Sequence, residues 1–204
     1  MANISRVNGL RPVKHVDGSP WNGQLNRYYV AASDGTAIFQ GDLVKLAAVT
    51  DTQGQTVIPG VPAIGGTQGA TKFVAGTDSA AVGVMCGVSI NPLNLNSPQY
   101  RVASTAMYIL VADAPDTVFE IQSAVASPPA TDLNLNAQVQ DAGGSTVTGQ
   151  SGETIASYAA TATLPLKVMG ASQKVDNDVT SVNYKVLVII NNHQYSGGTG
   201  TLGI

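Results

Sequence analysis

Turn-forming residues divide most of this chain into short β-like stretches. The 204 residues include 22 glycines and 10 prolines, and Asn-Gly, Asp-Gly and Ser-Pro pairs recur along the chain. Such pairs favour tight turns, whereas the Val-, Ile- and Thr-rich stretches between them favour extended structure. No alternation of strands and helices is present that would build a parallel α/β sheet. The sequence therefore predicts an all-β fold.

The clearest periodicity lies at residues 80–90. Val82, Val84 and Val88 fall on one face of an extended segment with Cys86, while Gly83 and Gly87 fall on the other. Period-two alternation is typical of a half-buried strand. The strand candidates are residues 27–32, 36–39, 43–49, 72–75, 80–90, 106–112, 117–125, 164–169 and 182–190. We expect a β-sandwich or barrel of short antiparallel strands, with an extended N-terminal arm and at most one short helix.

Two segments carry more local predictions. Residues 106–112 and 117–125 flank Asp113-Ala-Pro-Asp116, which predicts a β-hairpin with a four-residue loop. Residues 132–140 are compatible with a short helix capped by Asp132, although their asparagines argue against one. Both alternatives stay open for that segment.

The expected organisation is one β domain with two extensions. Residues 1–26 contain too many turn pairs for a helix and predict an extended arm. Residues 27–190 form the domain, in which 50–71 and 126–163 are expected to be long loops or insertions. Residues 191–204 show no core pattern and are expected to form a tail.

Charge is scarce and unevenly placed. Only 11% of the residues are charged, whereas 44% are hydrophobic. A weakly charged surface suits a subunit of an assembly better than a free monomer, because interface cores are depleted in charge. Residues 1–30 carry a net charge of +3 and the rest of the chain carries −6. The basic arm is expected either to dock on an acidic partner or to be an ordinary polar terminus.

The residues that commonly carry chemistry do not form a recognisable site. Two histidines and one cysteine, without metal-ligand spacing, predict no metal site and no cofactor. Ser151 lacks the strand–turn–helix setting of a nucleophile, and His15 and His193 lie in the arm and near the tail. The Gly198-x-Gly200-x-x-Gly203 string has no helix after it to bind a dinucleotide. The chain is therefore predicted not to be an enzyme, to span no membrane and to bind no nucleic acid directly.

The N-terminal residues resemble a known family. Gly9-Leu-Arg-Pro12 leads into Gly18-Ser-Pro-Trp-Asn-Gly23, followed by Tyr28 and Tyr29. This pattern is similar to the start of tailed-bacteriophage head decoration (capsid cement) proteins. The resemblance continues through residues 39–45 and 111–122 and covers about half of the chain.

The resemblance implies a structural virion protein. Such proteins are made in the host cytoplasm, bind the outer surface of the capsid, commonly as homotrimers, and hold neighbouring major capsid subunits together. Trp21 is expected either to anchor the arm on its own domain or to contact another subunit. The expected interface residues are Arg11, Lys14, Trp21, Arg27, Tyr28 and Tyr29. The alternative function is a non-catalytic receptor- or carbohydrate-binding β module of the virion surface or tail.

Overall fold

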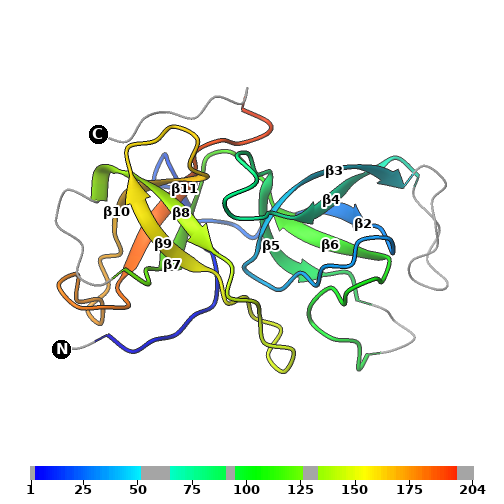
Figure 1. The fold of residues 1–204 in the computed structure, drawn as a ribbon, viewed down its shortest axis with the longest axis horizontal. Coiled ribbons are helices and arrows are strands. Elements are labelled where there is room, and N and C mark those ends of the chain that lie inside the picture. The colour runs from blue at the N-terminus through cyan, green and yellow to red at the C-terminus, as the bar shows by residue number, and fades with distance from the viewer. Residues whose placement is uncertain (1–2, 52–64, 91–94, 126–132, 197–204) are drawn as a thin grey trace.

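The computed structural model describes residues 3–51, 65–90, 95–125 and 133–196. These residues form eleven β-strands and no α-helix, which confirms the predicted all-β fold. Figure 1 shows two β units side by side along the long axis of the molecule. The strands are β1 (Arg11–His15), β2 (Asn26–Val30), β3 (Leu43–Asp51), β4 (Thr67–Lys72), β5 (Gly83–Val88), β6 (Met107–Ala112), β7 (Thr117–Gln122), β8 (Asn136–Gln140), β9 (Thr154–Ala159), β10 (Leu166–Ala171) and β11 (Lys185–Ile190).

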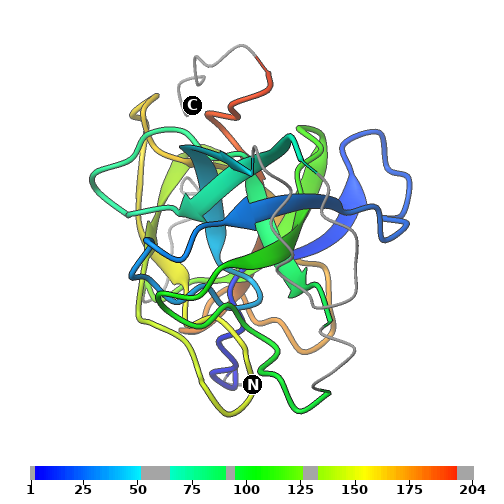
Figure 2. The same ribbon diagram turned by 90° about the vertical axis from the view of Figure 1, so that its right-hand side faces the viewer.

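The first unit is a closed barrel with the strand order β2-β4-β3-β5-β6, which lies in front in Figure 2. Neighbouring strands are antiparallel, except that β2 and β4 run parallel. Val30, Ile38 and Ile109 are fully buried in its core, together with the ring of Tyr28. Closure pairs each strand on both sides, so the barrel presents few free backbone groups along its wall.

The second unit is a six-stranded antiparallel sheet in the order β1-β7-β11-β10-β8-β9. In β11, Val186, Val188 and Ile190 are buried while the residues between them are partly exposed, as the pleat of a half-buried strand requires. The sheet is strongly curved, so that β9 at one edge approaches the end of β7. The N–H of Ala124, just after β7, donates to the carbonyl of Ile155 in β9 at 2.9 Å.

Strand β5 separates the hydrophobic core of the barrel from that of the six-stranded sheet. Val84 packs in the core of the six-stranded sheet, whereas the next residue, Met85, packs in the core of the barrel.

The prediction that the valines and Cys86 share one face is therefore wrong. Val84 and Cys86 pack against the core of the six-stranded sheet, whereas Val82 and Val88 pack against that of the barrel. The register of β5 against β6 shifts between Met85 and Gly87, which breaks the period-two alternation. Burial raises the pKa of the Cys86 thiol to about 11, so the thiol stays protonated and unreactive near neutral pH.

The predicted hairpin of 106–112 and 117–125 is wrong. Strand β6 pairs with β2 and β5 in the barrel, whereas β7 pairs with β1 and β11 in the other sheet. Residues 113–116 therefore connect the two units. The turn residues predicted correctly that the strand at 106–112 ends before them. They do not determine with which strands the two segments pair.

Strands also form where loops were expected. Residues 136–140 are strand β8 rather than a helix, with Ala137 and Val139 buried, so the helical alternative for 132–140 is wrong. Asp132, its expected cap, lies outside the described residues. Strand β9 likewise lies within 126–163, and β4 includes the end of the predicted loop 50–71, much of which is not described.

The start of the expected tail returns to the barrel. The carbonyl of Asn192 accepts from Ala81 N at 3.0 Å, and the N–H of Gln194 donates to the Ala81 carbonyl at 2.9 Å. His193 is 1% exposed. Residues 191–196 thus join the end of β11 to the barrel, and the remainder of the tail lies outside the described residues.

Candidate interaction surface

The N-terminal segment, residues 3–24, lies along the body instead of extending from it. Strand β1 pairs with the edge of β7, with Arg11 opposite Glu120 and His15 opposite Thr117. Just before it, Leu10 is 1% exposed in the core of the six-stranded sheet. The dense turns predicted correctly that this segment is not helical. The buried side chain of Leu10 and the otherwise open edge of β7 explain why this segment is bound to the body.

Two glycines allow this segment to approach the barrel. The N–H of Leu10 donates to the carbonyl of Gly41 at 2.9 Å. Gly9 and Gly41 both have positive φ angles, 64° and 99°. A Cβ atom on Gly9 would collide with the Gly41 carbonyl oxygen, and one on Gly41 with the carbonyl oxygen of Asn8. Only glycine fits this contact without strain.

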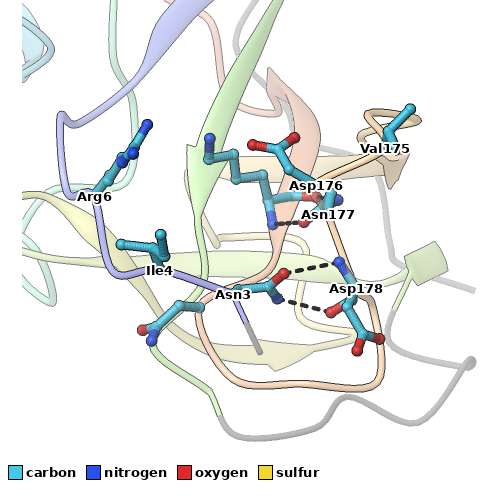
Figure 3. Close-up of a pocket in the computed structure, with 9 residues that line it drawn as sticks. Asn3, Ile4, Arg6, Val175, Asp176, Asn177 and Asp178 are labelled. Carbon is cyan, nitrogen blue, oxygen red and sulfur yellow. Dashed lines mark hydrogen bonds between the residues drawn. The ribbon is translucent and has the colours of Figure 1, made fainter. Parts of the chain in front are cut away.

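The first described residues are fixed against the loop that joins β10 to β11. The side-chain amide of Asn3 donates to the carbonyls of Asp178 and Val182 at 2.7 and 3.0 Å, and its oxygen accepts from Asp178 N at 2.8 Å. Figure 3 shows the contact between Asn3 and Asp178 beside a hollow of about 200 Å³. Arg6 and Lys185 contribute cations to its lining, and Asp176 and Asp178 contribute carboxylates.

Exposed aliphatic side chains lie on the two segments that form this hollow, and we call them the apolar rim. The four side chains are Ile4, Val175, Val179 and Val182. Ile4 is 69% exposed and Val175 is fully exposed. Ile4 and Val175 line the hollow directly, and the carbonyl of Val182 binds Asn3. Clustered exposed aliphatic residues are typical of a surface that another protein covers.

The cations Arg6, Arg11 and Lys14 are exposed along the same segment. Within the part of the chain that the structure describes, none of the three forms an ion pair with an acidic side chain. Their backbone is nevertheless held, because the N–H of Arg6 donates to the Gln122 side chain at 2.8 Å and the other two belong to β1. The result is a fixed basic strip beside an apolar rim.

The six residues expected at an interface are not all on the surface. Arg11 and Lys14 are exposed, whereas Trp21 is partly buried and packs against the core of the six-stranded sheet. Arg27 is also partly buried. Tyr28 and Tyr29 are 3% and 7% exposed and belong to the barrel wall.

Of the two alternatives for Trp21, the structure thus supports an anchor on its own domain. The apolar rim was not foreseen, because its valines lie in an aperiodic polar loop. The only available signal was their aliphatic character at positions that otherwise favour turns.

A buried charge cluster joins the two units. We call Asp42, Lys72, Asp141 and Glu153 the seam cluster. The Lys72 ammonium lies 3.1 Å from Asp42 Oδ2 and 3.0 Å from Asp141 Oδ1, and Glu153 Oε2 accepts from Leu43 N at 3.0 Å. Asp42, Lys72 and Glu153 are all less than 5% exposed. Asp42 and Lys72 come from the barrel, whereas Asp141 and Glu153 come from the loop between β8 and β9.

The pKa values in the cluster move in different directions. Burial and the charge of Asp42 raise the pKa of Glu153 well above its ordinary value, and burial raises that of Asp42. Burial opposes ionisation of Asp141, but its bonds to Lys72 and Gly143 outweigh this and lower its pKa. Glu153 Oε1 and Asp42 Oδ1 are buried with no hydrogen-bond partner in the described structure. One ammonium is thus shared among three carboxyl groups.

The residues considered for catalysis are placed within this framework. Ser151 is 2% exposed, and its hydroxyl accepts from Glu153 N at 2.9 Å. The hydrogen bonds seen among the described residues connect it to neither histidine. His15 lies 3.3 Å from Asp116, and Nδ1 of His193 accepts from Tyr195 N. In residues 3–51, 65–90, 95–125 and 133–196, no three His, Cys, Asp or Glu side chains are arranged to hold a metal ion.

Comparison with known proteins yields no relative. No protein-family model matches the chain, and neither the curated proteins nor the solved structures contain a significant match. In the described part of the chain, no helix has the length and apolar character needed to cross a membrane.

Proposed function

We propose that this chain is a structural protein of a tailed-bacteriophage virion. In this proposal it binds the outer surface of the capsid and stabilises the contacts between neighbouring major capsid subunits. Its partners are the major capsid protein and further copies of itself, in a homotrimer. The role requires neither catalysis nor a cofactor, and it places the protein on the virion, away from membranes and from the packaged DNA.

The observation that carries the proposal is the fixed basic strip of the N-terminal segment. The residues similar to decoration proteins, from Gly9 to Gly23, form β1 and the turns that follow it. Arg11 and Lys14 project from this segment without ion pairs to described acidic residues. A strip already held by its own sheet loses little conformational freedom when a partner binds, which favours affinity.

The apolar rim supports the same proposal. It lies at the beginning of the N-terminal segment, so cations and exposed aliphatic side chains occupy neighbouring parts of one surface. Interfaces commonly combine an apolar centre with charged surroundings. An acidic, partly apolar patch on the shell is the complementary partner.

The test uses virions assembled from the encoding genome after deletion of this gene. Purified protein is added, and bound copies are counted after sedimentation of the particles. We expect the unaltered protein to bind at a fixed ratio to the shell protein, and Arg11→Gln/Lys14→Gln to bind several-fold less, with a stronger loss at low salt.

The matched control is Lys45→Gln/Lys167→Gln, which removes the same charge from β3 and β10, away from the N-terminal segment and the apolar rim. This control is expected to bind like the unaltered protein. Failure of the unaltered protein to sediment with the particles contradicts the capsid role. Equal loss in both variants contradicts the role of the basic strip.

A further inference from the structure

The mouth of the barrel holds a second cavity, distant in sequence from the basic strip. Its volume is about 470 Å³, and it is a shallow hollow that is largely open to the solvent. Its lining comes from the start of β2, the start of β4, the linker after β6 and the chain after β11. The side chains that carry the argument are Asn26, Arg27, Tyr28, Gln68, Asp113 and Tyr195. None belongs to the N-terminal segment, so the cavity is independent of the proposed capsid contact.

Asp113 is a fixed acceptor in this cavity. The Asn26 side-chain amide donates to both carboxylate oxygens, at 2.9 and 3.0 Å, and the Tyr28 hydroxyl donates to Oδ2 at 2.6 Å. Burial, and next its bond to Asp113, raise the pKa of Tyr28, so the hydroxyl stays protonated and remains a donor. A carboxylate oriented in this way keeps lone pairs for a further donor.

Tyr195 adds an exposed ring and an incomplete set of hydrogen bonds. Its ring is 43% exposed, and its hydroxyl contacts both the Tyr28 hydroxyl, at 2.9 Å, and Gln68 Oε1. Because the Tyr28 proton is directed to Asp113, the single Tyr195 proton can serve only one of these two contacts. One of the oxygens of Tyr28, Tyr195 and Gln68 is thus left to accept a hydrogen bond from a ligand.

The charges of the lining select against ions. Asp113 is an anion, and Arg27 is a cation whose guanidinium lies 4.7 Å from the centre of the Tyr108 ring. An anionic ligand would be repelled by Asp113, and a cationic ligand would be repelled by Arg27. A neutral ligand rich in hydroxyl groups instead offers donors to Asp113 and acceptors to Arg27, and its C–H face suits an aromatic ring.

We propose that the mouth of the barrel binds a saccharide, with a pyranose ring against Tyr195 and its hydroxyls on Asp113 and Gln68. The site gives the chain a binding function separate from its contact with a shell. Small barrels are suited to this, since the ends of several strands bring polar side chains together at a mouth whose position the barrel fixes.

The test is saturation-transfer NMR on the full chain with the methyl glycosides of glucose, galactose, mannose and N-acetylglucosamine at millimolar concentration. We expect transfer to at least one glycoside. Tyr195→Ala abolishes it by removing the ring, and Asp113→Asn weakens binding about tenfold or more, since bonds to charged groups are the strong ones. Tyr195→Phe keeps the ring and retains part of the binding.

Met169→Ala is the matched control, since Met169 is 47% exposed on β10 and lies outside the cavity lining. It is expected to bind like the unaltered protein. Tyr195 is exposed, so its replacement tests the site even if Asp113→Asn unfolds. Absence of transfer to all four glycosides overturns the proposal, as does unchanged transfer with Tyr195→Ala. Neither result bears on capsid binding, which Tyr195→Ala is expected to leave intact.

Discussion

The seam cluster and the N-terminal segment use the chain's few charges in opposite ways. In the seam cluster, Lys72 is 4% exposed and lies between Asp42 and Asp141. On the N-terminal segment, Arg11 and Lys14 are exposed, and the described residues provide them with no ion pair. The first set lies where the two β units meet and is buried except for Asp141, whereas the second is directed to the solvent.

In our proposal, this difference separates charges that stabilise the fold from charges that bind a partner. Removing one member of a buried pair leaves an uncompensated charge, whereas exposed charges contribute little to the free energy of folding. In the seam, the charges also specify how the loop between β8 and β9 meets the barrel, since no apolar partner would satisfy Lys72. The following variants test this separation.

The largest effect is expected for Lys72→Met. The substitution preserves the length of the side chain but leaves Asp42 buried without its cation. We expect it to lower the free energy of unfolding near neutral pH by about 3–5 kcal/mol, measured by chemical denaturation. The loss should shrink below about pH 5, because protonated carboxyl groups no longer need the ammonium.

Lys174→Met is the control for this variant. Its ammonium lies 2.8 Å from Glu120, but its side chain is 52% exposed. The Glu120 side chain is only 8% exposed, but it keeps the hydrogen bond from the Ser172 hydroxyl, and Lys174 is itself half exposed. Removing Lys174 should therefore cost about 1–2 kcal/mol, less than Lys72→Met. Equal losses in the two variants would contradict the special role of the seam cluster.

A smaller effect of the opposite sign is expected for Glu153→Gln. The pKa of Glu153 is raised in the folded protein, so the folded state binds its proton more tightly than the unfolded state does. The unaltered protein therefore loses stability as the pH rises above the ordinary glutamate value of about 4.5 and towards the folded pKa. Glutamine cannot ionise and is free of this loss.

Chemical denaturation across the pH range measures the difference. Glu153→Gln should be more stable than the unaltered protein at neutral and alkaline pH, by about 1.4 kcal/mol for each unit of pKa difference that is removed. The two proteins should converge in acid. Because Asp42 and Glu153 influence each other, the change belongs to the pair. A pH dependence that is the same in both proteins would show that Glu153 is not protonated in the fold.

The sequence predicted the strands whose pattern is local. The valines around β5 and the apolar stretch that contains β11 were found within a few residues of their bounds, since runs of β-branched residues between turn signals indicate strands. The connection at 113–116 was misassigned because strand pairing depends on distant edges. The two-unit arrangement follows from those pairings and leaves no mark in any single window of sequence.

The residues of the candidate sites were likewise predictable only where the signal is local in the sequence. Arg11 and Lys14 were singled out because basic residues gather near the N-terminus, and the structure leaves both exposed. Their role at an interface stays a prediction. Tyr28 was expected at an interface, but the barrel buries its ring and leaves only its hydroxyl to bind Asp113. Asp42 and Glu153 are 111 positions apart in the printed sequence. No spacing rule links them, and only the packing of the units brings them together.

The smallest effect on folding is expected for Arg11→Gln/Lys14→Gln. Both side chains are exposed, β1 keeps its backbone pairing with β7, and glutamine introduces no like charge beside Glu120. The free energy of unfolding should change by less than about 0.5 kcal/mol, measured under the conditions used for Lys72→Met. The same variant is expected to bind capsids several-fold less well, so stability and binding separate in one protein. A loss of stability comparable to that of Lys72→Met would contradict this separation, because the basic strip would then belong to the fold as the seam cluster does.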